Sequence, residues 1–229
     1  MTGMLASVNS VAEALLVLSV TVDIIDLKQP ASGALGALDI ELVKQIVNGI
    51  DGRCPVSATI GDLPMRPDLV FNAAKTMSET GVDYIKIGFF PDGDWLETVN
   101  KLSILSQQNI ALIAVLFADI QPDLTIVDSL KDAGFTGIML DTMDKQNGSL
   151  MQVMDKTKIG RFVRLAKARH LLCGLAGSLK LQDIPVLMPY QPDYLGFRGA
   201  LCRQHDRTAQ LNKASIMRIK QVMQDTVSA

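Results

Sequence analysis

Short apolar runs alternate with longer segments of helical periodicity from one end of the chain to the other. The runs are rich in β-branched residues, and in the segments between them apolar residues recur every three or four positions. The predicted strands cover residues 4–8, 23–28, 55–60, 83–88, 110–117, 137–142, 171–177 and 194–200, and the predicted helices cover residues 11–18, 40–48, 67–80, 94–107, 124–133, 159–168, 180–188 and 213–224. Repeated β-α units of this size imply an all-parallel sheet, for which a closed (β/α)8 TIM barrel is the natural arrangement.

The chain of 229 residues has the usual length of one such barrel, so residues 1–229 are predicted to form a single domain. No linker or low-complexity segment divides it. The alternative is an open, doubly wound parallel sheet. A closed barrel is favoured, because no GxGxxG motif follows the first strand and the strand count suits closure.

Composition excludes several classes of protein. Hydrophobic residues make up 48% and charged residues 20% of the chain, and its net charge is -2, which argues against disorder and against nucleic-acid binding. No apolar run is long enough for a membrane span, and no basic region precedes the first apolar segment. The three dispersed cysteines indicate a reducing compartment. We therefore expect a cytoplasmic protein, without membrane or nucleic-acid partners, that forms a homo-oligomer.

Lys86 lies in the predicted strand Asp-Tyr-Ile-Lys-Ile-Gly at residues 83–88. If Ile85 and Ile87 face the helices, Tyr84 and Lys86 face the inside of the barrel. A charged amine in such a place is costly to desolvate unless it is paired or neutral. A neutral lysine amine can attack a carbonyl and form a Schiff base.

The other even-numbered strands follow the same alternation. It predicts that Asp26 and Lys28 of the second strand, Asp141 of the sixth and Arg198 of the eighth point inward. All of them lie near the C-terminal ends of their strands, where active sites of barrels occur. Each alone could be a charge that has reached solvent at the end of a strand, but the agreement of four strands indicates a site.

These charges suggest a particular chemistry. Lys28 and Lys86 would share one cavity with Asp26 and Asp141, and Lys145 follows on the next loop. Crowded cations favour the neutral, nucleophilic form of one amine, and nearby carboxylates can move protons once an iminium has formed. The sequence pattern alone favours a solvated loop position for Lys145 over a position in the cavity.

A phosphate site is predicted at the seventh and eighth strands, where barrels commonly bind phosphate. Gly177 allows close backbone approach, and Ser178 is expected to cap the following helix. Arg198 and Gly199 add a guanidinium and an open backbone at the next strand. Arg203 and Arg207 could assist, with Arg203 as the candidate for a second phosphate. The two histidines are far apart in the sequence, so no metal site and no cofactor are expected.

Several motifs together resemble the (5-formylfuran-3-yl)methyl phosphate synthase family, also described as 4-(hydroxymethyl)-2-furancarboxaldehyde-phosphate synthase. The resemblance runs nearly end to end, and the ordered set of motifs is specific. The motifs are DIIDLKQP at 23–30, GALG at 33–36, VSATIGD at 56–62, DYIKIG at 83–88, MLDT at 139–142, LAGS at 175–178 and GFRGA at 196–200.

The resemblance implies a (β/α)8 barrel that converts two molecules of glyceraldehyde 3-phosphate into a phosphorylated furan aldehyde, a lyase reaction that releases phosphate and water. It implies a Schiff-base role for Lys86 and active-site roles for Asp26, Lys28, Asp141 and Lys145. The product would serve the synthesis of methanofuran or a related furan cofactor of one-carbon metabolism. Two alternatives remain open: a Schiff-base aldolase or isomerase acting on another sugar phosphate, and a non-catalytic phosphosugar-binding protein.

Overall fold

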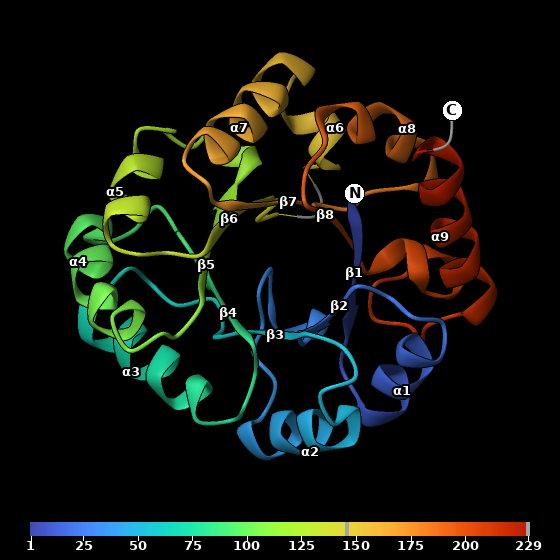
Figure 1. Ribbon diagram of the computed structural model, residues 1–229, viewed down its shortest axis with the longest axis horizontal. Coiled ribbons are helices and arrows are strands. Elements are labelled where there is room, and N and C mark those ends of the chain that lie inside the picture. The colour runs from blue at the N-terminus through green and yellow to red at the C-terminus, as the bar shows by residue number, and fades with distance from the viewer. Residues whose placement is uncertain (145–146, 228–229) are drawn as a thin grey trace.

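Parallel strands close into a barrel in the computed structural model of the chain, which describes residues 1–144 and 147–227. The strands are hydrogen-bonded in chain order, and the first pairs with the last to close the sheet, so the predicted (β/α)8 barrel is confirmed. Figure 1 shows the barrel end-on, with the helices in a ring around it. The strands are β1 Gly3–Val8, β2 Ile24–Leu27, β3 Val56–Thr59, β4 Tyr84–Gly88, β5 Leu112–Phe117, β6 Gly137–Asp141, β7 Leu172–Leu175 and β8 Tyr194–Phe197.

The helices pack their apolar faces against the outside of the barrel. Several begin at a residue whose side chain accepts a backbone N–H of the first turn, namely Ser10, Asp39, Asp94 and Asp155. In the described part of the chain, none of the helices has the length and apolar character that a membrane span requires. The helices are α1 Val11–Ser19, α2 Ile40–Ile50, α3 Pro67–Ser78, α4 Trp95–Ser106, α5 Ile126–Asp132, α6 Leu150–Val153, α7 Lys156–Ala168, α8 Ile184–Leu187 and α9 Lys213–Val227.

The continuous helix predicted over residues 180–188 is wrong. A 3-10 turn, Leu181–Asp183, leads into the single turn of α8, and a second 3-10 turn, Met188–Tyr190, follows it. Pro185 lies inside the predicted range and has no N–H to donate to the carbonyl of Leu181, so a continuous α-helix would lose a hydrogen bond at this point. The short helix α6 was also not predicted.

Aspartates that directly precede or begin the even-numbered strands hold the start of the barrel together. In three places the carboxylate accepts the backbone N–H of the first or second residue of a neighbouring odd-numbered strand. The aspartates are Asp23, Asp83 and Asp193, and their respective partners are the N–H groups of Met4, Val56 and Cys173, each at 2.7 Å. The strand starts are thereby fixed in register by charge-assisted hydrogen bonds.

Side chains alternate along the strands between the helix layer and the barrel interior, as expected. Ile25, Leu27, Ile85 and Ile87 belong to the core between sheet and helices. A separate apolar cluster fills much of the interior, and its members are Leu5, Ala34, Leu35, Ile113, Val115, Phe117, Met139, Ala176 and Tyr194. The interior charged residues lie beside this cluster, toward the C-terminal ends of the strands.

Candidate active site

Lys86 and Asp26 form a buried ion pair inside the barrel. The Nζ of Lys86 lies 3.0 Å from Oδ1 of Asp26, and the residues are 1% and 0% exposed. The hydroxyls of Ser57 and Ser7 donate to the two carboxylate oxygens, at 2.7 and 2.8 Å. The carboxylate is therefore held by three donors from three strands, and the amine has a fixed position against it.

The protonation of Asp26 reflects these partners. Burial alone would raise the pKa of its carboxyl group, because desolvation disfavours the charged form. The positive charges of Lys86 and Lys28 and the hydrogen bonds from Ser57 and Ser7 outweigh this effect, so the pKa lies below its usual value. Asp26 is thus a carboxylate in the resting protein.

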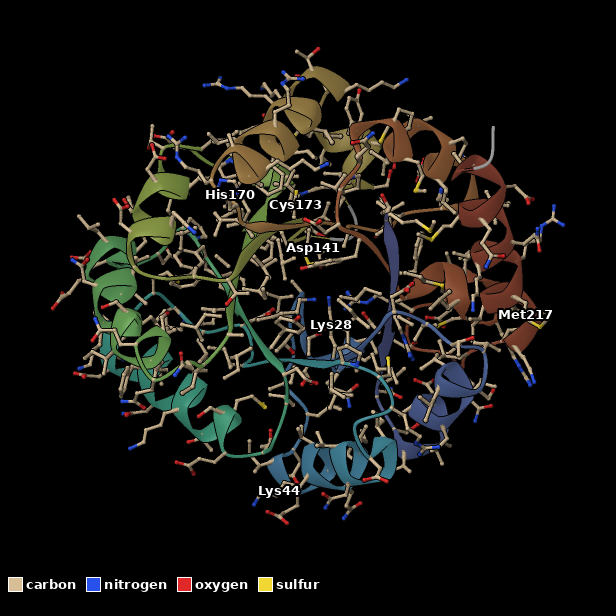
Figure 2. All side chains as sticks on the ribbon, viewed as in Figure 1. Lys28, Lys44, Asp141, His170, Cys173 and Met217 are labelled. Atoms are coloured by element: carbon tan, nitrogen blue, oxygen red, sulfur yellow. The ribbon has the colours of Figure 1, made fainter. Side chains whose placement is uncertain are left out.

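A second pair, Lys28 with Asp141, lies nearer the mouth of the barrel. The Nζ of Lys28 is 3.3 Å from Oδ2 of Asp141, and the two side chains are 8% and 4% exposed. The other oxygen, Oδ1, accepts the backbone N–H of Thr142 at 2.7 Å. Figure 2 shows the labelled residues Lys28 and Asp141 near the centre of the ring, where they approach each other from the end of β2 and from β6.

Both pairs line one cavity of about 390 Å³, within the usual range for small-molecule sites. The cavity opens toward the loops that follow β7 and β8. Its wall combines the two lysine–aspartate pairs with small and apolar side chains. Besides the pairs and Ser7, it includes Leu5, Met139, Ala176, Ser178, Leu179, Lys180, Gln182, Gly196, Phe197, Arg198, Gly199, Ala200, His205 and Arg207.

The loop after β2 closes the other side of the barrel mouth. Leu35 is fully buried and packs in the interior cluster with Phe117. The carboxylate of Asp62, on the loop after β3, accepts the N–H groups of Ala34 and Leu35 at 2.7 and 2.6 Å and so holds this loop down. The cavity is consequently off-centre, beside an apolar plug.

Arg198 faces the barrel as predicted, but its guanidinium is engaged by the protein itself. Nη1 and Nη2 lie 2.5 and 3.3 Å from the carboxylate oxygens of Glu13 on α1. Further bonds run from Nη1 to the carbonyl of Ser7, from Nη2 to that of Ala209 and from Nε to that of Arg207. The arginine borders the cavity without offering it a free donor pair.

The remaining predicted phosphate ligands lie close to the cavity in different ways. Ser178 and Gly199 line it, whereas Gly177 is buried behind it, where a Cβ would meet Thr142 at 2.9 Å. The expectation that Ser178 caps a helix is wrong, because it adopts a φ of 50° and the next turn begins after Lys180. The phosphate roles of these residues stay predictions.

Other predicted residues contribute less. Lys145 lies outside the described residues. Arg203 is exposed and does not line the cavity. Within residues 1–144 and 147–227, no cluster of His, Cys, Asp or Glu side chains has the arrangement of a metal site.

Sequence reasoning missed Ser7, Ser57, Glu13 and Asp62. The alternation that identified Asp26 and Lys86 also predicts inward positions for Ser7 and Ser57. A small hydroxyl side chain that faces inward beside a carboxylate could therefore have been recognised as its hydrogen-bond donor. Glu13 and Asp62 act on groups far away in the sequence, so no local pattern identifies them.

A closed (β/α)8 barrel with two lysine–aspartate pairs in one cavity at the strand ends has the architecture of a barrel enzyme. A family model described as 4-HFC-P synthase matches residues 4–220. The chain therefore belongs to the 4-HFC-P synthase family, and the resemblance seen in its motifs is confirmed.

Named relatives agree with this assignment. A candidate (5-formylfuran-3-yl)methyl phosphate synthase of Methylorubrum extorquens is 40% identical over 222 residues, which are 96% of this chain and 91% of the relative. The (5-formylfuran-3-yl)methyl phosphate synthase of Methanococcus maripaludis is 33% identical over 97% of this chain and 99% of its own. These synthases support an enzyme of methanofuran-type cofactor synthesis.

Solved structures resemble the chain in fold. The 3-hexulose-6-phosphate synthase of Salmonella typhimurium superposes with a TM-score of 0.73 at 16% identity, covering 98% of this chain and all of its own. The 3-keto-L-gulonate-6-phosphate decarboxylase of Vibrio cholerae gives a TM-score of 0.70 at 10% identity, covering 98% of both chains. At such identities the likeness shows the barrel alone.

Proposed function

We propose that this protein condenses two molecules of glyceraldehyde 3-phosphate into (5-formylfuran-3-yl)methyl phosphate through a Schiff base on Lys86. The observation that carries the proposal is the Lys86 amine, buried in the cavity and 3.0 Å from Oδ1 of Asp26. Membership of the synthase family supports the reaction, and the buried amine supports the lyase chemistry.

The first steps use the Lys86–Asp26 pair. Asp26 takes the proton of the ammonium group, and the freed nitrogen adds to the aldehyde carbon of one glyceraldehyde 3-phosphate. Water leaves and the C=N bond forms. Asp26 and Lys28 then move the proton of the neighbouring carbon, which converts the iminium into an enamine.

The later steps use the second pair. The enamine expels the phosphate group at the end of its chain, which leaves an enol conjugated with the C=N bond. The terminal carbon of this enol attacks the ketone carbon of the second triose phosphate, after isomerisation of that molecule, and forms the branched carbon skeleton. Asp141, 3.3 Å from the Lys28 amine, supports the proton transfers that accompany loss of phosphate, loss of water and closure of the furan ring. Water then hydrolyses the C=N bond, which releases the product aldehyde and the Lys86 amine. The resemblance assigns Lys145 to these steps as well.

Borohydride trapping tests the imine and identifies the amine. Reduction with glyceraldehyde 3-phosphate present should add mass to Lys86 and block trypsin there, producing a peptide of residues 76–101. Lys28 is the one other amine paired with a buried carboxylate among the described residues that line the cavity, and modification there produces residues 1–44 instead. The peptide recovered thus decides between the two lysines.

Lys86→Met should abolish both trapping and turnover, with circular dichroism reporting the fold. Lys44→Met is the matched control, since Lys44 lies on the outer face of α2 (Figure 2) and should change neither. Ultraviolet absorbance and mass analysis of the product identify the reaction. Trapping without a furan product indicates a Schiff-base aldolase or isomerase, and absence of both indicates a binding protein.

The remaining parts of the proposal concern the cellular setting. We place the enzyme in the cytoplasm, with the furan phosphate passed on to methanofuran or methylofuran synthesis. Association into a homo-oligomer stays a prediction.

A further inference from the structure

The two triose phosphates of the proposed reaction carry one phosphate group each. Among the described lysines and arginines that line the cavity, Lys180 and Arg207 form no ion pair. Lys28 and Lys86 are paired with aspartates. The donors of Arg198 are directed at Glu13 and at backbone carbonyls. Arg207, on the loop after β8, also lines the cavity, and within the described residues its side chain makes one hydrogen bond, from Nη2 to the carbonyl of Gly33 at 2.8 Å.

The position of Arg207 is fixed by the buried pair beneath it. Arg198 Nε donates to the carbonyl of Arg207 at 2.8 Å, and Arg198 Nη2 donates to that of Ala209 at 3.1 Å. Glu13 accepts the N–H of Leu211 at 3.2 Å. The Glu13–Arg198 pair therefore holds the backbone of this loop at several points, while the Arg207 side chain extends to the carbonyl of Gly33 on the loop after β2.

Arg207 is affected by charges of both signs. Burial lowers the pKa of Arg207, the charges of Asp141 and Asp62 oppose that shift, and the neighbouring Arg198 adds to it. A guanidinium has five donors, and all but one of those on Arg207 remain for a ligand. A phosphate monoester could accept hydrogen bonds from two of these donors in parallel, and its negative charge would offset the repulsion between Arg207 and Arg198.

We infer that Arg207 binds the phosphate of the second triose phosphate, and that Glu13 and Arg198 position its loop without contacting substrate. The inference rests on the proposed function, and it assigns the second phosphate site that the sequence left to Arg203. Arg203 belongs to the same loop but is exposed and lies off the cavity. It is therefore the matched control for Arg207.

Titration with inorganic phosphate tests the ligand without any turnover. Arg207→Ala should weaken phosphate binding on the order of 10- to 100-fold, the range for losing hydrogen bonds to a charged group. Arg203→Ala should bind phosphate like the parent protein. Equal affinity in all three proteins would overturn the inference, even if furan synthesis is confirmed.

Kinetics separate the phosphate role from a structural one. Arg207→Ala should lower kcat/KM for glyceraldehyde 3-phosphate by a similar factor, mainly through KM, while imine trapping with unphosphorylated glyceraldehyde stays at the parent level. Arg207→Lys should recover part of the loss, because it restores the charge without the paired donors. Loss of trapping with both aldehydes contradicts a phosphate-specific role. If phosphate affinity depends on Arg207 but the protein forms no furan product, the proposed function is wrong and the anion site at Arg207 is still supported.

Discussion

Glu13 and Arg198 lie 185 positions apart in the chain and meet through two contacts of 2.5 and 3.3 Å. Glu13 belongs to the first helix and Arg198 directly follows the last strand, so the pair joins the two ends of the barrel where β1 and β8 close it. Both side chains are nearly excluded from solvent. Their contact ties closure of the sheet to the shape of the loop that carries Arg207.

Glu13→Gln should destabilise the protein by about 3 kcal/mol or more, because it leaves the Arg198 charge buried without its partner. Urea unfolding followed by circular dichroism measures the change. Glu41→Gln, which breaks an exposed pair with Lys44 on α2, is the control and should leave the midpoint unchanged. If both variants unfold at the same urea concentration, the buried Glu13–Arg198 pair stabilises the protein no more than the exposed Glu41–Lys44 pair does.

The lowered pKa of Asp26 predicts an acid-dependent loss of stability. A carboxyl group whose pKa is lower in the folded state stabilises the protein above its unfolded pKa, near about pH 4, and this contribution is lost as the pH falls through the folded value. In the double variant Asp26→Asn/Lys86→Met, which removes both charges, the free energy of unfolding should fall less steeply below about pH 4 than in the parent. If the free energy of unfolding falls equally steeply with pH in both proteins, the lowered pKa of Asp26 is contradicted.

Gly174 on β7 leaves the space that the ring of Tyr194 on β8 occupies. A Cβ at this position would lie 2.2 Å from the ring, so Gly174→Ala should destabilise by about 1–3 kcal/mol through overpacking. Gly49 on α2 has no atom within 4 Å of a built Cβ, and Gly49→Ala should stabilise by up to about 1 kcal/mol. Thermal unfolding of the two variants should therefore shift in opposite directions.

The three cysteines are free and buried, and burial raises the pKa of each thiol. Thiolates are the reactive form, so the native protein should react slowly with a thiol reagent at neutral pH. All three should react at once in denaturant. Rapid labelling of one thiol under native conditions would show that its segment opens locally.

Alternation along the strands was enough to predict the barrel and the inward direction of its charged residues. Successive side chains of a strand point to opposite faces of the sheet. The apolar residues next to Asp26 and Lys86 in the sequence face the helices, so Asp26 and Lys86 must face the barrel interior. The inward positions of Ser7 and Ser57 follow from the same alternation. The distance between Asp26 and Lys86 follows from the curvature of the closed sheet, and no local pattern carries that information.

The errors have a different origin. The segment over residues 180–188 has helical periodicity, but the backbone at Pro185 and Pro189 decides its form. The phosphate role of Arg198 was inferred from its place at a strand end and stays a prediction, whereas its ion pair with Glu13 was not foreseen because Glu13 is remote in sequence. Competition between a ligand and a distant side chain for the same donors becomes visible only in three dimensions.

The apolar plug of Leu35 and Phe117 fills part of the barrel interior without lining the cavity. The room inside the barrel is therefore limited by side chains that carry no charge. Shortening Leu35 should create free volume beside the cavity and leave both lysine–aspartate pairs in place. Redesign could in this way change the volume of the interior separately from its ionised groups.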